Sequence, residues 1–310
     1  MFVEILTNSI GELAALAAAS IWAGTSIIDN LLGEKISPRH MVFFKGATGI
    51  VLTALALLWQ GVGFPTLSPV NLGFLLLSGV IGISFSDTCY FQALYCLGAR
   101  RTLLLLTLTS PCSALLAFTF LQENLSLINW MGMGVTIFGV AWVIGERSSE
   151  ECNSKQSLQL KKGAIYGLLA AMGQAAAAVL CRAALTQSSL NPLWSTLLRL
   201  SAGVIALLLW HTLQTRKQSP GKQQQKQFGG LSLDTLVRVA VSAFFATFLG
   251  IWLQQTAFKY AATGVVQALS ATSPVFILPI AMWMGEKVSF RAIQGVLIAF
   301  AGIGLLLGLV

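Results

Sequence analysis

The sequence predicts an all-α integral membrane protein in which ten transmembrane helices form two inverted five-helix repeats. Composition, the recurrence of long apolar stretches and an internal duplication predict this fold class. The chain of 310 residues is 55% hydrophobic and only 10% charged, with a mean hydropathy of +0.77. Soluble domains average about 25% charged residues, so this chain cannot keep its apolar surface out of water by folding alone and needs a bilayer.

The predicted helices are apolar stretches long enough, at roughly 19 residues or more, to cross a hydrocarbon core of about 30 Å. The first stretch is expected to remain in the protein, because no basic residue precedes Lys35 as it would in a cleavable signal peptide. Polar residues 146–162 separate a first repeat, 1–145, from a second, 163–310. We predict helices over residues 12–32, 40–60, 70–97, 102–121, 127–145, 163–184, 193–213, 235–259, 263–284 and 291–310.

A set of residues recurs, type for type, 163 positions further along the chain. Chance similarity between Leu/Ala-rich stretches explains shared Leu and Ala, but not Pro, Glu and paired Gly in one register. Five helices are an odd number, so the second repeat enters the membrane from the opposite side, and a substrate site is expected between the halves. The residues are Thr109, Ser110, Pro111, Glu123, Ser126, Gly132 and Gly139, matched by Thr272, Ser273, Pro274, Glu286, Ser289, Gly295 and Gly302. A weaker match, 154 positions apart, joins Pro38, Lys45 and Gly49 to Pro192, Arg199 and Gly203.

The basic residues indicate an orientation. Fourteen Lys and Arg residues fall in the odd-numbered loops between the predicted helices, whereas the even-numbered loops hold only Lys259. The positive-inside rule then places the odd-numbered loops in the cytoplasm and both termini outside. Anchoring beside the membrane also accounts for the net charge of +8, so no nucleic-acid partner is expected.

These features together resemble the drug/metabolite transporter superfamily and, within it, the EamA-type ten-helix exporters. The resemblance covers essentially the whole chain and is carried by Trp22–Gly24, the two Ser-Pro pairs, Glu123, Glu286 and the glycine pairs. It implies a central cavity open to one side at a time and small organic cargo such as amino acids, nucleotide sugars, sugar phosphates or drugs. Such proteins are usually drawn with cytoplasmic termini, in conflict with the charge count, so the orientation stays open.

Charged side chains inside spans are the first candidates for a site, because each costs about 2.5 to 3.5 kcal/mol at a helix centre. Asp29 and Lys45 are expected at similar depth, either as a salt bridge that fastens two helices or as part of a substrate site. Asp87 has no acidic counterpart, since Ile251 takes the aligned place. It is interpreted either as a proton carrier or ammonium ligand, or as a solvated residue at a helix end.

Arg182 and Arg199 are expected near one another in two helices that contain no acid. A substrate carboxylate or phosphate would relieve their repulsion at Arg199, while lipid headgroups are the simpler partner for Arg182. Uncharged groups within spans could bind cargo or hold helices together. Those taken as substrate-binding candidates are Trp22, Gln92, Gln174 and Gln255.

The repeated prolines and glycines predict mechanical features. Pro111 and Pro274 each remove one helical hydrogen bond near mid-span, so paired kinks that act as gates are expected. Glu123 and Glu286 are interpreted as turn locks that accept from backbone N–H groups opening the next helix. The glycine pairs should let the fifth and tenth helices approach neighbours closely, within the monomer or in a homodimer.

The sequence therefore favours an alternating-access secondary transporter in the plasma or inner membrane that exports a small polar or amphipathic metabolite such as an amino acid. The expected partners are this small-molecule substrate and the bilayer, with a coupling proton as an open alternative at Asp87. A channel or structural membrane protein remains an alternative, although inverted repeats with mid-helix prolines favour alternating access. An enzyme is disfavoured because the acids inside spans are isolated, and five scattered cysteines without a CxxC pair indicate no metal site or cofactor.

Overall fold

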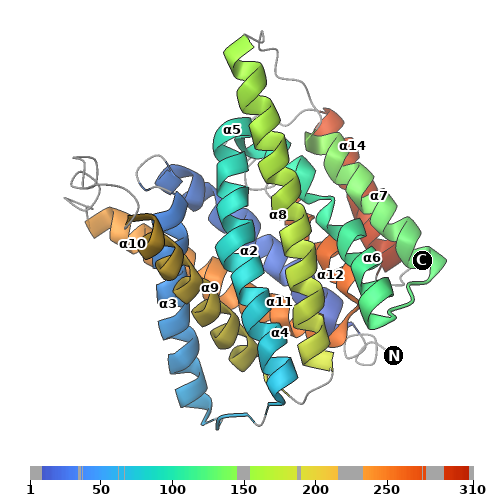
Figure 1. Cartoon of the computed structure of the whole chain (residues 1–310). Helices are drawn as coiled ribbons and strands as arrows, with labels where there is room; N and C mark the ends of the chain where they lie inside the picture. The colour runs from blue at the N-terminus through green and yellow to red at the C-terminus, as the bar shows by residue number, and fades with distance from the viewer. Residues whose placement is uncertain are drawn as a thin grey trace.

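In the computed structural model, the regular elements of the described residues are all helices (Figure 1). The first half contains α2 (Ile10–Gly33), α3 (Pro38–Gln60), α4 (Pro69–Gly79), η1 (Val80–Ser86), α5 (Asp87–Leu106), α6 (Thr109–Leu121) and α7 (Leu127–Ile144). The second half contains α8 (Ser154–Thr186), α9 (Pro192–Thr215), α10 (Leu233–Ser242), η2 (Ala243–Leu249), α11 (Gly250–Tyr260), α12 (Thr263–Ser270) and α14 (Phe290–Leu306). The structure describes residues 9–33, 36, 38–61, 63–65, 67–144, 154–186, 190–215, 233–273, 275–276 and 290–306.

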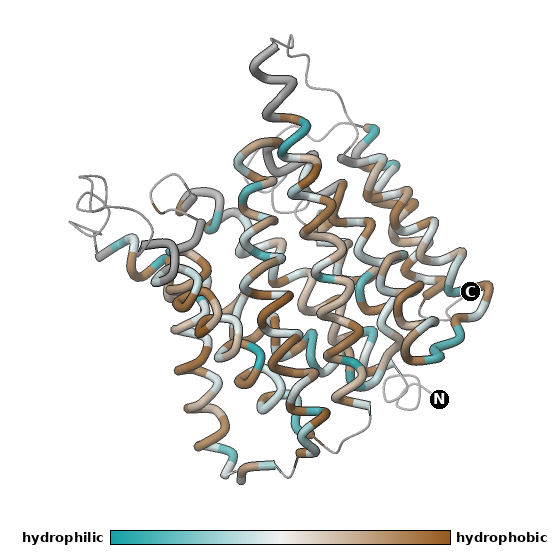
Figure 2. The backbone as a smooth tube through the Cα atoms, viewed as in Figure 1, coloured by the Kyte–Doolittle hydropathy of each residue, from teal (hydrophilic) through white to brown (hydrophobic). Residues whose placement is uncertain are grey.

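The chain is an integral membrane protein of two repeats. Five helices are long and apolar enough to cross a bilayer, and three shorter apolar helices accompany them within the described ranges. Figure 2 shows hydrophobic residues along the full length of the bundle. Large apolar side chains face outward, which suits lipid and not water. Examples are Trp59, Phe120, Leu127, Ile205 and Leu297.

The two halves run in opposite directions. In Figure 1 the chain rises from α4 to α5, whereas from α10 to the corresponding α11 it runs obliquely from left to right and downward. The most extensive packing joins helices of different halves: α7 with α14, α5 with α8, α2 with α11 and α3 with α9. Exchanging the halves converts the α2–α11 pair into the α8–α5 pair, so the packing follows the internal duplication.

Each half contains one π-helix, and the two lie at equivalent places. Val80–Ser86 and Ala243–Leu249 are separated by the same 163 positions as the repeated motif. A π-helix is rare and is often found at a functional site, because its wider turn redirects the residues that follow. In this chain the residue that follows η1 is Asp87.

The predicted turn between the third and fourth spans forms differently from expectation. Hydrogen bonding remains helical through residues 98–101, and α5 ends only at Leu106. The chain still reverses its direction in this stretch, as its contacts with α8 show. Leu97 packs on Gly163, whereas Leu105, later in the chain, packs on Gly167, which lies further along α8. Only one glycine and no proline stand in this stretch, so the local sequence does not force a helix break.

The glycine pairs bring α7 and α14 together within the monomer. A Cβ added to Gly139 would lie 2.5 Å from the backbone nitrogen of Ala299. A Cβ added to Gly302 would collide with Thr136. The close approach predicted for these glycines is therefore confirmed, with the neighbour in the same chain.

Candidate functional site

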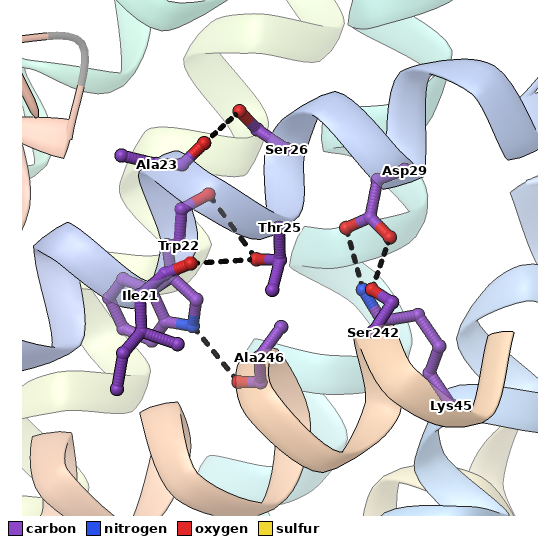
Figure 3. Close-up of polar contacts among 9 residues, drawn as sticks. All are labelled: Ile21, Trp22, Ala23, Thr25, Ser26, Asp29, Lys45, Ser242 and Ala246. Carbon is purple, nitrogen blue, oxygen red and sulfur yellow. Dashed lines mark hydrogen bonds and ion pairs between the residues drawn. The ribbon is translucent and has the colours of Figure 1, made fainter. Parts of the chain in front are cut away.

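Asp29 and Lys45 form an ion pair between α2 and α3 (Figure 3). Lys45 Nζ donates to Asp29 Oδ2 at 2.6 Å, and Ser242 Oγ donates to the other carboxylate oxygen at 2.5 Å. Ser242 ends α10, so this group joins the two halves. The Lys45 charge is thus compensated within the protein.

Trp22 also bridges the halves. Its Nε1 donates to the carbonyl oxygen of Ala246, in η2, at 2.9 Å (Figure 3). A Cβ added to Gly250 would lie 2.5 Å from the same nitrogen. Trp22 therefore packs directly against the end of the second π-helix.

Asp87 lies where η1 passes into α5 and faces the second half. Gln174 Nε2, on α8, donates to Asp87 Oδ1 at 3.1 Å. The carboxylate is also attracted to Arg199 and, more weakly, to Lys45. Two sequence candidates from the second half, Gln174 and Arg199, are thus brought to Asp87.

The structural counterpart of Asp87 is Gly250, not Ile251 as expected, because each is the first residue after its π-helix. The counterpart is still uncharged, so the asymmetry at this position remains. Tyr90, one turn after Asp87, lies in the electrostatic field of both Asp29 and Asp87. It was missed at the sequence level, where a tyrosine in an apolar span carries no distinguishing signal.

Arg199 is only 4% exposed and sits on α9 against the first π-helix. The backbone of α9 at Arg199 packs on Gly79 so closely that a Cβ there would clash. A Cβ on Gly82 would lie 3.2 Å from Arg199 Nη2 and 3.7 Å from Gln174 Oε1. Within the described side chains, Arg199 forms no ion pair, since the pairs found are Lys45–Asp29, Arg182–Glu123 and Arg238–Asp234.

A second polar group surrounds Gln255, which is fully buried on α11. Its Oε1 accepts from Ser195 Oγ at 2.8 Å and from the Cys181 thiol. Arg199 Nη1 lies 3.9 Å from Cys181 Sγ, so the Gln255 group and Arg199 are contiguous. Ser195 and Cys181 were not foreseen, because small polar residues in apolar helices look like ordinary packing.

Arg182 and Glu123 have partners that differ from those expected. Arg182 Nε donates to Glu123 Oε1 at 2.6 Å, so its partner is a carboxylate and not a lipid headgroup. Glu123 Oε2 accepts from the backbone N–H of Thr263 at 3.0 Å. The glutamate therefore holds the start of α12 in the other half, not the start of the next helix. Sequence reasoning chose the nearest helix, but tertiary packing brings a distant one closer.

The remaining candidates either have no contact described with Asp87 or Arg199 or lie outside the described residues. Gln92 is half-buried on α5. Near Pro111 the chain leaves the helix at residues 107–108, where Ser110 N donates to Thr107 O at 3.3 Å, and α6 starts at Thr109. Pro274 and Glu286 lie outside the described residues.

Comparison with known proteins identifies the family. The chain is similar to a solved structure titled "Crystal structure of protein", with a TM-score of 0.74 and 14% sequence identity over 96% of each chain. At this identity the similarity supports the fold alone. A search of curated protein sequences finds no match. The sequence model of the EamA-like transporter family matches residues 9–145 and 161–308, one match in each half. This protein, with its two packed repeats and its buried charges between them, therefore belongs to the EamA-like transporter family.

Proposed function

We propose that the protein is a secondary transporter that exports a small zwitterionic or anionic metabolite, such as an amino acid, across the plasma or inner membrane. Its two halves would rock relative to one another, so that the polar groups between them are exposed first to one side of the bilayer and then to the other. Arg199 holds the negative end of the cargo, and Asp87 holds a positive end or a coupled proton. Trp22, Gln92, Gln174 and Gln255 contribute the uncharged contacts.

The observation that carries this proposal is the pair of opposite charges on opposite halves. Asp87 and Arg199 attract each other across the interface, yet no ion pair joins them among the described contacts. Buried charges are retained in membrane spans chiefly where they serve a pathway or a partner. A cargo with a carboxylate and an ammonium group would satisfy both.

Lys45 has a supporting place in this scheme. From the sequence, Lys45 could belong either to a salt bridge with Asp29 or to a substrate site, and Asp29 compensates its charge in the structure. We assign it to the interface with Ser242, where the Asp29–Lys45 pair would have to part from the second half as the halves move.

The test is reconstitution into liposomes loaded with a mixture of the common L-amino acids, with and without a pH gradient. Wild-type protein is expected to exchange at least one of them. Asp87→Asn and Arg199→Ala should each slow this exchange by at least about tenfold, equivalent to roughly 1.4 kcal/mol. Arg238→Gln, which alters an exposed pair, is the matched control and should leave exchange unchanged. Undiminished exchange by both site variants would contradict the proposed function.

A further inference from the structure

Two side chains that both contact Cys181, Arg199 and Gln255, each carry a buried donor without an acceptor among the described residues. Among the described residues, neither Arg199 Nε nor Gln255 Nε2 has a hydrogen-bond partner. Arg199 is 4% exposed and Gln255 is 0% exposed, so both donors are withdrawn from the protein surface. Leaving such donors unpaired is unfavourable, most of all for a guanidinium group.

The two side chains are held in place by different contacts. Gln255 Oε1 accepts from Ser195 and Cys181, which turns its amide nitrogen away from both. Arg199 is fixed by the thiol of Cys181 on one side and by the approach of Gly82 on the other. Both donors are thus contributed by packed helices, α9 and α11.

We infer that Arg199 and Gln255 form a carboxylate subsite, an inference that rests on the proposed function and names the group on the cargo. A carboxylate is planar and has two oxygens, which suit one guanidinium and one amide donor. The acid-free helices α8 and α9 supply a single cation here, which matches a monoanion better than a doubly charged phosphate. Asp87 then selects for an ammonium group on the same cargo.

The decisive variant is Gln255→Glu. Glutamate has nearly the same shape and keeps an oxygen for Ser195 and Cys181, but it replaces the free donor with an acceptor and, when ionised, places a negative charge near Arg199. Both changes oppose a bound carboxylate. Binding of the common L-amino acids and of their α-carboxamides is measured by thermal shift of purified full-length protein in detergent. Wild type should prefer at least one acid over its amide, and the variant should bind that acid about tenfold to a hundredfold more weakly. Affinity for the amide should fall far less.

Gln254→Glu, the same change one residue earlier, is the matched control and should keep the wild-type preference. Equal affinity of wild type for acids and amides, or an unchanged preference in Gln255→Glu, would overturn the carboxylate subsite. The proposed function fails separately, if wild-type protein in liposomes exchanges neither acids nor amides. Gln255→Leu removes the acceptor as well as the donor. Its melting temperature shows how much the contacts of Gln255 with Ser195 and Cys181 contribute to stability. A melting temperature of Gln255→Glu near that of wild type then assigns its binding defect to the altered subsite and not to loss of folding.

Discussion

At the scale of single residues, the buried charges fall into three groups. Asp29 and Lys45 pair near one end of α2, and Glu123 and Arg182 pair in the turn that follows α6. In the third group, Asp87 and Arg199 form no ion pair with any described side chain, although Gln174 donates to Asp87. Both closed pairs reach into the opposite half, through Ser242 in one case and through Arg182 and Thr263 in the other. The paired charges join the halves, and the other two are the ones that we propose to bind the cargo.

Removing one partner of the Glu123–Arg182 pair should destabilise the protein. In Arg182→Gln, a carboxylate only 17% exposed would lose its guanidinium, at a cost of about 3 kcal/mol. The melting temperature in detergent should fall clearly, whereas Arg238→Gln should cost under about 1 kcal/mol. The double variant Glu123→Gln with Arg182→Gln should recover part of the loss. Equal melting of Arg182→Gln and wild type would show that this pair does not fasten the halves.

The partners of some of these charged residues could be predicted from the sequence, and those of others could not. Asp29 and Lys45 lie on consecutive helices joined by a short loop, so their approach could be predicted. Glu123 and Arg182 are 59 positions apart and in different halves. No local pattern encodes which distant helices meet, and for that reason the Gln255 group, drawn from three helices, was also beyond prediction.

At the scale of elements, α7 and α14 depend on glycine for their contact. Gly139→Leu should force the two helices apart and destabilise the protein by about 1–3 kcal/mol. Gly134, on the same helix, has nothing within 4 Å of an added Cβ, so Gly134→Leu should be close to neutral. Melting temperatures of the two variants provide the measurement. A larger loss in Gly134→Leu would contradict this account of the packing.

The helix break before Pro111 is the element expected to matter for motion. Proline cannot donate the hydrogen bond that would continue the helix across residues 107–108. Pro111→Ala restores that donor and should stiffen the span, so the protein should fold but exchange cargo more slowly, by roughly threefold to tenfold. Pro69→Ala, at the first turn of α4, where proline is tolerated, is the control. Liposome exchange at equal protein content measures both. Faster or unchanged exchange in Pro111→Ala would count against a gate.

At the scale of the whole molecule, the closest packing lies between the halves and not within them. The sequence revealed the number of helices and the duplication, because apolar length and repeated motifs are local properties. It did not reveal that α2 packs along α11 or α3 along α9.

Two chains cut between Ile144 and Ser154 should therefore assemble when produced together. Each half alone would expose to lipid the polar faces that normally meet, such as Asp87 with Gln174, and should be degraded or aggregate. Co-purification of an untagged half with a tagged partner measures assembly. Stable accumulation of either half by itself would show that the interface is dispensable.

The matched π-helices have a consequence for the origin of the protein. Such turns make up well under 1% of residues in globular proteins, so two separate insertions at equivalent positions are a poor explanation. We infer that the wide turn preceded the duplication of the five-helix unit. Because each copy has an odd number of helices, that turn now occurs once in each of the two opposite directions across the membrane.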